Sequence, residues 1–263
     1  MSKAQARRSP AIMDVMSDTI EGRNPVLEAL RAGRPINRIL ISRTAQRHSV
    51  IAEILNLARR LDIPFEQVDD LVIRKQSVTG ASQGIMAFTA AKDYVALGDL
   101  LAASKKKHEA ALYCVLDGIE DPQNLGAILR TADAIGCHGV IVRVRRAVGL
   151  TPTVAKVSAG AIEYVPVARV ANIAQTLEDL KKTGVWSVGI DMSGDQDFTK
   201  VDYTAPTAIV IGGEGKGVSE LVRKRCDIVA RIPMKGHIGS LNASVAAALV
   251  LYEAMRQRDS KKL

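Results

Sequence analysis

The feature that most constrains the fold is a series of short apolar runs in the second half of the chain, separated by stretches with helical spacing. The first run reads ALYCVLD, and later runs read HGVIVRV, VWSVGID, TAIVIGG and IVARIPM. Apolar residues at successive positions, rather than at alternate ones, are typical of strands that are buried on both faces. Strands and helices in alternation predict an α/β domain with a mostly parallel sheet over residues 110–263.

A shorter alternation of the same kind precedes this region. The segments INRILIS, PFEQV and GIMAF are predicted strands, and a helix is predicted between the first two from its apolar spacing. A chain of 263 residues is long enough for two such domains. We therefore expect a flexible polar tail at residues 1–20, a small α/β domain at residues 21–90, a linker at residues 91–109 and the larger domain at residues 110–263.

The charge of the chain favours a polyanionic partner, with nucleic acid as the first candidate. The formal net charge is +8 and the pI is about 9.5. Residues 1–90 contain 13 Lys and Arg against 9 Asp and Glu, so one third of the chain carries half of the net positive charge. We therefore predict that the first domain binds the polyanion.

Composition disfavours several other classes of protein. Aromatic residues make up only 3% of the chain, too few for a sheet that stacks bases. The three cysteines are widely spaced and the four histidines lack ligand spacing, so we expect neither a disulfide framework nor a metal site. No apolar stretch is long enough to span a membrane, and the first residues lack the apolar core of a secretory signal. The expectation is a cytoplasmic protein with no membrane partner.

A glycine-rich turn, GGEGKGVS, occupies residues 212–219 at the end of the predicted strand TAIVIGG. Its spacing fits neither a P-loop, which needs G-x-x-x-x-G-K-[ST], nor the dinucleotide fingerprint G-x-G-x-x-G. Glu214 within the turn would also repel a pyrophosphate group, which disfavours a nucleotide hydrolase. Two interpretations stay open: a tight strand-to-helix turn, or a loop whose backbone presses against a neutral or cationic ligand.

Two further segments combine the end of a strand with polar residues at the start of a helix. In LDGIEDPQNLGAILRTAD, Asn124 and Arg130 fall on the predicted helix. In IPMKGHIGSLNASVA, Ser240 and Asn242 come just before or at the start of another helix. Taken singly, such Asn and Ser residues are more often helix caps, and such an Arg is more often part of a surface ion pair.

Together with the glycine-rich turn, these segments resemble the three motifs of the SpoU/TrmH family of RNA ribose 2′-O-methyltransferases, within the SPOUT superfamily. The matching strings are D-P-x-N-L-G-A-I-x-R-T-A-D, I-G-x-E-G-x-G and I-P-M-x-G-x-x-x-S-L-N-x-S-V-A. In the first domain, GRNPVLEAL and SQGI are similar to the substrate-binding domain of bacterial large-subunit (23S) ribosomal RNA guanosine 2′-O-methyltransferases. The resemblance implies a small domain like ribosomal protein L30e and a deep trefoil knot in the C-terminal part of the larger domain.

The resemblance also implies the chemistry. It implies S-adenosylmethionine as methyl donor, no metal, RNA as acceptor, and a homodimer with the site near its interface. The residues implied in donor binding are Gly212, Gly213, Ile232, Met234 and Leu241. The residues implied in catalysis are Asn124, Arg130, Glu214, Ser240 and Asn242. Because a guanidinium group stays protonated in proteins and is a very poor proton acceptor, we expect Arg130 to clamp a phosphate beside the acceptor rather than to accept its proton.

Two other functions compete with the methylation of a guanosine in large-subunit ribosomal RNA. One is a transfer RNA 2′-O-methyltransferase of the same family, which the dedicated first domain disfavours by analogy. The other is a non-catalytic RNA-binding factor in ribosome assembly, which the intact motif residues disfavour.

The final predicted helix leaves a smaller question open. Val245, Leu249, Tyr252 and Met255 share one face of this helix. Such a face fits either ordinary core packing or the dimer contact that the resemblance implies.

Overall fold

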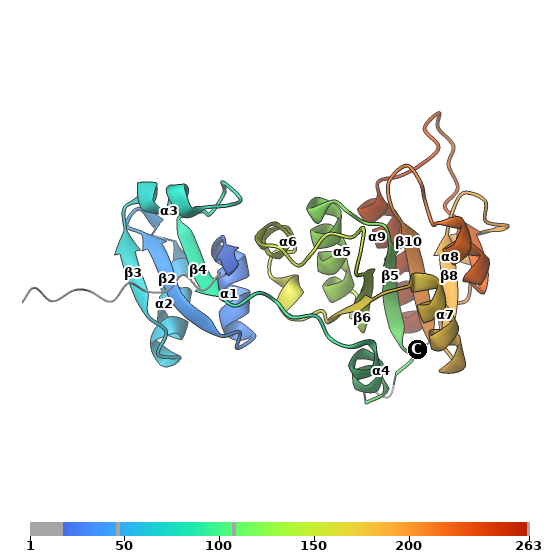
Figure 1. Ribbon diagram of the computed structural model, residues 1–263, viewed down its shortest axis with the longest axis horizontal. Coiled ribbons are helices and arrows are strands. Elements are labelled where there is room, and N and C mark those ends of the chain that lie inside the picture. Colours follow the sequence, from blue (N-terminus) through green and yellow to red (C-terminus); the bar gives the residue numbers. More distant parts are fainter. Residues whose placement is uncertain (1–17, 46–47, 107–108, 262–263) are drawn as a thin grey trace, which may run out of the picture.

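The structure is a computed structural model that describes residues 18–45, 48–106 and 109–261. Figure 1 shows two domains placed along the longest axis, a smaller one from the first part of the chain and a larger one from the rest. Residues 1–17, which make up most of the predicted tail, lie outside the described residues.

The small domain is a four-stranded sheet with helices packed against it. The strand order is β1-β4-β2-β3, with β4 antiparallel to β1 and β2, and β3 parallel to β2. Helices α1 and α2 bury Leu30, Ile51 and Ile54 in one cluster with Ile39 of β2, which explains their helical spacing. The elements are β1 (Asp18–Glu21), α1 (Arg23–Arg31), β2 (Ile36–Ser42), α2 (Ser49–Arg60), β3 (Phe65–Val68), α3 (Asp70–Gln76) and β4 (Ile85–Thr89).

Elements β1, α3 and α4 (Leu97–Lys105) fall where the sequence predicts no helix or strand. β1 begins inside the predicted tail because it pairs with β4 and buries Ile20. Helix α4 lies inside the predicted linker because Leu100 packs on the larger sheet. A Cβ on Gly139 of that sheet would lie only 2.4 Å from Leu100 Cδ1. Elements this short give a weak periodic signal, so their tertiary contacts decide their structure.

The large domain contains a seven-stranded sheet in which each described pair of neighbouring strands is parallel, in the order β7-β6-β5-β10-β8-β11-β9. This confirms the predicted mostly parallel α/β architecture. The elements are β5 (Leu112–Asp117), α5 (Pro122–Ala134), β6 (Gly139–Arg143), α6 (Pro152–Val157), η2 (Ala161–Glu163), β7 (Val167–Val170), α7 (Ile173–Lys182), β8 (Trp186–Ile190), β9 (Gln196–Asp197), η3 (Phe198–Lys200), β10 (Thr207–Gly212), α8 (Glu220–Arg225), β11 (Ile228–Arg231) and α9 (Ala243–Ser260).

Helices cover both faces of this sheet, and successive strand residues point to opposite faces. Cys114 and Ile209 belong to the core formed with α5, α6 and α9. Their neighbours Val115 and Val210 belong to the core formed with α4, α7 and α8. All four side chains are fully buried. Strands with two buried faces have no polar face, which accounts for the continuous apolar runs in the sequence.

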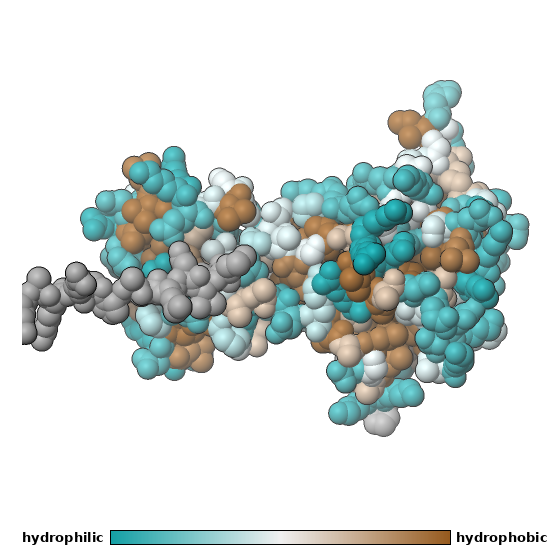
Figure 2. Space-filling model, in the orientation of Figure 1, coloured by the Kyte–Doolittle hydropathy of each residue, from teal (hydrophilic) through white to brown (hydrophobic). Residues whose placement is uncertain are grey.

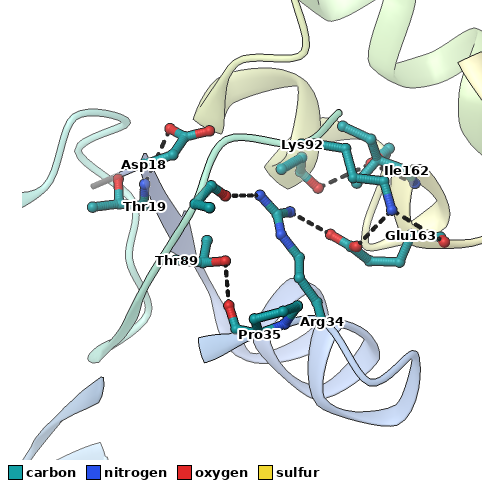
Figure 3. Close-up of polar contacts among 11 residues, drawn as sticks. Asp18, Thr19, Arg34, Pro35, Thr89, Lys92, Ile162 and Glu163 are labelled. Atoms are coloured by element: carbon teal, nitrogen blue, oxygen red, sulfur yellow. Dashed lines mark hydrogen bonds and ion pairs between the residues drawn. The ribbon is translucent and has the colours of Figure 1, made fainter. Parts of the chain in front are cut away.

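An ion cluster joins the two domains (Figure 3). Glu163 of η2 places one carboxylate oxygen 2.6 Å from Arg34 Nη1 and the other 3.1 Å from Lys92 Nζ. The Glu163 side chain is 1% exposed and the Arg34 side chain 8%. Nearby, the Tyr164 hydroxyl donates to Glu28 at 2.6 Å. In Figure 2 this junction is a narrower waist between two lobes. The small domain is therefore docked by specific contacts as well as connected by the chain.

Candidate active site

The polar residues singled out from the sequence, except Arg130, lie near one edge of the large sheet, where β5, β8 and β10 end. Gly212, the last residue of β10, pairs with Asp117 of β5, while Ile211 pairs with Ile190 of β8. Asp117 and Asp191 therefore flank the end of β10, one on each side. In parallel α/β sheets, ligands bind outside the carboxyl ends of the strands, so this edge is the place to look for a site.

The glycine-rich turn after β10 folds tightly back on itself. A Cβ on Gly212 would lie 1.9 Å from the Gly217 carbonyl carbon, and Gly217 has a φ of +60°. The Gly213 N–H donates to the Asp117 carbonyl oxygen at 3.0 Å, and the Ser219 N–H donates to the Asp117 carboxylate at 2.9 Å. The tight-turn interpretation is confirmed, and the same turn lines the two cavities described below.

Three polar side chains, one from each motif segment, meet beside this turn. Asn124 Nδ2 donates to Glu214 Oε1 at 2.9 Å, and Asn242 Nδ2 donates to the same oxygen at 2.7 Å. Asn242 Nδ2 also lies 2.9 Å from Asn124 Oδ1. Asn124 is buried, with 4% of its surface exposed. Glu214 Oε2 accepts no hydrogen bond from any residue that the structure describes, which leaves this oxygen available to a ligand.

The two asparagines differ in whether they also cap a helix. Asn242 Oδ1 accepts from the N–H groups of Ser244 and Val245 at 2.9 and 3.3 Å, so Asn242 caps α9 and enters the cluster through its Nδ2. Asn124 is not a cap: Asp121 caps α5 by accepting a backbone N–H at 2.9 Å. The capping interpretation of Asn124 is therefore wrong, and its side chain serves the cluster instead.

Two cavities share the glycine-rich turn as a wall, and we call them cavity A and cavity B. Cavity A has a volume of about 300 Å³, at the lower end of the range for small-molecule sites. Ser240 and Glu214 line it, together with apolar residues that include Ile190 and Ile211. It is also lined by every residue that the family resemblance implies in donor binding, namely Gly212, Gly213, Ile232, Met234 and Leu241.

Cavity B has a volume of about 370 Å³ and is lined mainly by polar residues. Arg143, Arg146 and Lys216 supply positive charge to it. Arg146 has a φ of +55°, a left-handed conformation that is uncommon for residues with a side chain. Its other charged or amide lining residues are Asp117, Glu120, Asp121, Asn124 and Glu214. Glu214 and Lys216 line both cavities, so the cavities meet at the turn.

Arg130 lies apart from this cluster. It is exposed on α5 and lines neither cavity. Its side chain makes no hydrogen bond or ion pair within the part of the chain that the structure describes. Arg130 lies six positions after Asn124, so the two side chains leave the helix in different directions. Within one chain, Asn124, Glu214 and Ser240 line the cavities. Asn242 lines neither cavity but joins the cluster through its hydrogen bonds to Asn124 and Glu214. Arg130 lies outside both the cavities and the cluster.

The apolar face of α9 is open rather than packed. Val245, Leu249 and Tyr252 are 47%, 43% and 48% exposed. The core-packing interpretation of these three residues is therefore wrong. The side of α9 that faces the core is formed instead by Ala243, Ala247, Val250, Leu251 and Ala254.

The sequence patterns do not single out three side chains that line the cavities: Asp191, Arg143 and Arg146. A signal for each is nevertheless present in the sequence. Asp191 directly follows an apolar strand, as Asp117 does, and the two arginines belong to the run RVRR at the end of another. Among the described residues, no group of His, Cys, Asp and Glu could hold a metal ion. Over the same residues, no helix has the length and apolarity needed to cross a membrane.

Comparison with known proteins gives two matches to family models that together cover most of the chain. Residues 111–252 match the SpoU rRNA Methylase family, and residues 19–95 match the family for RNA 2′-O ribose methyltransferase substrate binding. A candidate tRNA/rRNA methyltransferase of the TrmH family from Bacillus subtilis (strain 168) is 44% identical over 247 residues, which cover 94% of this chain and 98% of that protein.

Two solved structures match this chain over nearly all of its length. The SpoU methyltransferase AviRb from Streptomyces viridochromogenes, in complex with AdoMet, has a TM-score of 0.77 at 29% identity, covering 93% of this chain and 91% of that one. An AdoMet-bound rRNA methyltransferase from Sinorhizobium meliloti has a TM-score of 0.74 at 26% identity, covering 91% and 87%. With the three motif segments assembled at one edge of the sheet, these matches show that the chain belongs to the SpoU/TrmH family of RNA methyltransferases.

Proposed function

We propose that this protein uses S-adenosylmethionine to methylate a ribose 2′-hydroxyl of RNA, and that its target is a guanosine of large-subunit ribosomal RNA. The observation that carries the proposal is the pair of cavities that meet at the glycine-rich turn, with Glu214 lining both. A transfer reaction needs its donor and acceptor held side by side. Cavity A suits the donor, and cavity B suits a nucleotide of the acceptor RNA.

Cavity A has the chemistry that S-adenosylmethionine requires. Ile232, Met234 and Leu241 offer apolar side chains to adenine, and Gly212 offers main-chain groups that no side chain shields. Glu214 supplies negative charge for a sulfonium, where a phosphate would be repelled. When bound, S-adenosylmethionine supplies a methyl group on an excellent leaving group. The chain must then mainly position the acceptor, an effect worth up to roughly 7–11 kcal/mol.

Cavity B supplies the groups that position an RNA nucleotide. Arg143, Arg146 and Lys216 can pair with phosphate oxygens. Two amide donors hold Glu214 Oε1, so the carboxylate has a fixed orientation. Its free Oε2 can accept a hydrogen bond from the ribose 2′-hydroxyl and orient that oxygen for attack. The hydroxyl proton leaves to solvent once the new bond to oxygen has formed.

The position of Arg130 points to a homodimer in which this residue of each copy serves the site of the other. The open apolar face of α9 provides the contact surface. Helix α5, which carries Arg130, packs beside α9, and Asn242 of the cluster caps α9. A second copy on this face would bring Arg130 to the partner's cluster, where its guanidinium can clamp a phosphate beside the acceptor.

The small domain supports an RNA substrate larger than a single nucleotide. Residues 19–95 match a family model for substrate binding, and the first 90 residues hold half of the net positive charge. A separate docked domain of this kind fits a structured RNA such as ribosomal RNA in the cytoplasm.

Mapping ribose methylation across cellular RNA, with and without the protein, tests this proposal. We expect one guanosine of large-subunit ribosomal RNA to lose its 2′-O-methyl group when the protein is absent. Wild-type protein should restore the group, and Glu214→Gln should not. Loss of a 2′-O-methyl group from a transfer RNA position instead would show that the substrate is a transfer RNA. No change in any RNA, together with no transfer of labelled methyl groups by the purified protein, would indicate a non-catalytic RNA-binding factor.

Mixing two inactive variants tests the role of Arg130. Arg130→Ala should abolish methylation while donor affinity stays within a few-fold. When Arg130→Ala and Glu214→Gln chains are combined in equal amounts, half of the dimers contain one chain of each variant. Each of these mixed dimers has one complete site and one site that lacks both residues. We therefore expect about a quarter of wild-type activity. Mixed dimers that form but regain no activity would place Arg130 in its own chain's site or outside catalysis.

A further inference from the structure

Asp191 is a carboxylate in cavity A to which the family motifs give no role. It follows Ile190 at the carboxyl end of β8, and its N–H donates to the Ala230 carbonyl oxygen of β11 at 3.0 Å. Its side chain is only 14% exposed and lines cavity A together with the glycine-rich turn. An enclosed carboxylate of this kind needs partners for both of its oxygens.

The two oxygens of Asp191 differ in their surroundings. Oδ1 accepts from the Ser193 N–H at 3.0 Å and the Ser193 hydroxyl at 2.6 Å, and Arg223 Nη1 lies 3.4 Å away. Oδ2 accepts no hydrogen bond from any group in the described part of the chain. A Cβ on Gly217 would lie 3.0 Å from Oδ2, so this oxygen faces the glycine-rich turn.

These contacts keep Asp191 charged and hold it in one orientation. Partial burial alone would raise the pKa of its carboxyl, but the hydrogen bonds from Ser193 and the charge of Arg223 lower the pKa below its usual value. Arg223 Nη1 also donates to Ser193 Oγ at 2.9 Å, which fixes the side of the group away from the cavity. Oδ2 is therefore a preformed hydrogen-bond acceptor, and Gly217 has no side chain to cover it.

We propose that Asp191 Oδ2 accepts a hydrogen bond from a ribose hydroxyl of the methyl donor. This inference rests on the proposed function, in which cavity A holds S-adenosylmethionine. Asp191 follows Ile190, and its backbone pairs with Ala230 of β11. Ala230 in turn lies two residues before Ile232, which belongs to the apolar wall that we assign to adenine. Its free oxygen faces Gly217 in the turn that carries Glu214. The ribose joins adenine to the sulfonium. It is therefore the part of the donor that lies beside Asp191, between the apolar wall and Glu214.

A hydroxyl suits this oxygen better than the ammonium group of the donor does. Arg223 already offsets the charge of Asp191, whereas the contacts of Glu214 are neutral amides from Asn124 and Asn242. The uncompensated negative charge of cavity A therefore lies at Glu214, where the sulfonium belongs. Asp191 is an ionised acceptor whose charge is already balanced by Arg223, so its free oxygen suits a neutral hydroxyl donor. Acidic side chains bind ribose hydroxyls in the same way in dinucleotide sites.

Calorimetric titration of Asp191→Ala with three ligands tests the inference: S-adenosylmethionine, S-adenosylhomocysteine and 5′-methylthioadenosine. The third ligand has the ribose but neither the ammonium nor the sulfonium. We expect the variant to bind all three more weakly by a similar factor of about 10- to 100-fold, because each loses the same hydrogen bond to a charged acceptor. Asp191→Asn retains an acceptor oxygen and should recover part of the affinity, and it replaces Asp191→Ala if that variant misfolds.

Asp202→Ala is the matched control. Asp202 accepts from the N–H and hydroxyl of Thr204 at 2.8 and 2.7 Å, the same local turn, but it lines neither cavity A nor cavity B. This variant should keep wild-type affinities. If Asp191→Ala weakens only the binding of S-adenosylmethionine and S-adenosylhomocysteine, Asp191 contacts the ammonium group and the inference is wrong. Unchanged binding of all three ligands would also overturn it. A wild-type protein that binds none of them would overturn the proposed function itself, and the inference with it.

Discussion

Glu163 at the domain junction and Glu214 at the candidate site both join segments that are far apart in the sequence, but they use their oxygens differently. Glu163 pairs one oxygen with Arg34 and the other with Lys92, and its side chain is 1% exposed. Glu214 uses only Oε1, which accepts from two asparagines. The carboxylate of the junction is fully occupied by the fold, whereas the carboxylate of the site keeps one oxygen for a ligand.

The same contrast separates Glu21 from Asp191. Glu21 is fully buried, and its two oxygens accept from the Ser77 hydroxyl and the Val78 N–H, both at 2.6 Å. Asp191 keeps Oδ2 free. Asp117 lines cavity B, yet its oxygens contact Ser219 and Arg143, so it belongs with the structural carboxylates. A saturated carboxylate thus indicates a structural role, and a half-used one at a cavity wall indicates a role in binding.

The largest expected effect is that of Glu214→Gln, which tests the functional side of this contrast. We expect the single-turnover rate of methyl transfer to RNA to fall by about 100- to 1,000-fold, because the site loses its charged acceptor. Donor affinity should fall far less than the rate, and the free energy of unfolding should stay close to wild type. A near-normal rate would place Glu214 among the structural carboxylates.

Glu163→Gln tests the structural side. We expect the free energy of unfolding in urea to fall by about 3 kcal/mol, because buried Arg34 loses its charged partner. The control is Glu178→Gln, which breaks an exposed pair with Arg225 and should cost less than about 1 kcal/mol. Donor affinity should be unchanged, because cavity A contains no residue of the junction. Equal losses in the two variants would mean that the junction does not depend on a buried charge.

The smallest expected effect concerns the pH dependence of Glu21. Burial alone would raise its pKa, but hydrogen bonds from Ser77, Thr79 and Val78 lower the pKa below its ordinary value of 4.5. A carboxylate with a lowered pKa in the folded state stabilises the fold above its unfolded pKa, and this contribution disappears as the pH falls through the folded value.

Wild type should therefore exceed Glu21→Gln in free energy of unfolding by about 1–3 kcal/mol at neutral pH. This difference should shrink as the pH falls below 4.5. Urea unfolding of both proteins across the acidic range measures it. A difference that stays constant with pH would show that shape, and not charge, accounts for the contribution of Glu21.

Much of the large domain and of its polar cluster could be predicted from the sequence. Strands buried on two faces leave continuous apolar runs, and parallel strands place their carboxyl ends at one edge. The motif segments around Asn124, Glu214 and Asn242 each begin near such an end, so their convergence follows from the topology.

Other features depend on tertiary contacts that sequence patterns do not carry. The apolar face of α9 has the same spacing whether it meets the core or solvent, so the exposure of Leu249 could not be predicted. Helix α4 is too short for its periodicity to reveal Leu100 as an anchor. The position of Asp191 after an apolar strand places it at the edge of the sheet, but only the structure shows that one of its oxygens has partners and the other has none among the described residues. Arg130 lies on the same helix as Asn124, but the turn of that helix directs it elsewhere.

Strand β10 lies between β5 and β8, so the backbone ladders hold Asp117 and Asp191 on its two sides. Neighbouring strands are about 4.8 Å apart, which separates the two α-carbons by about 10 Å whatever their side chains are. The backbone of the sheet therefore sets the spacing between the two aspartates that flank the end of β10. Substitutions of core side chains leave this separation unchanged. One residue inserted within β10 would instead displace the walls of both cavities together.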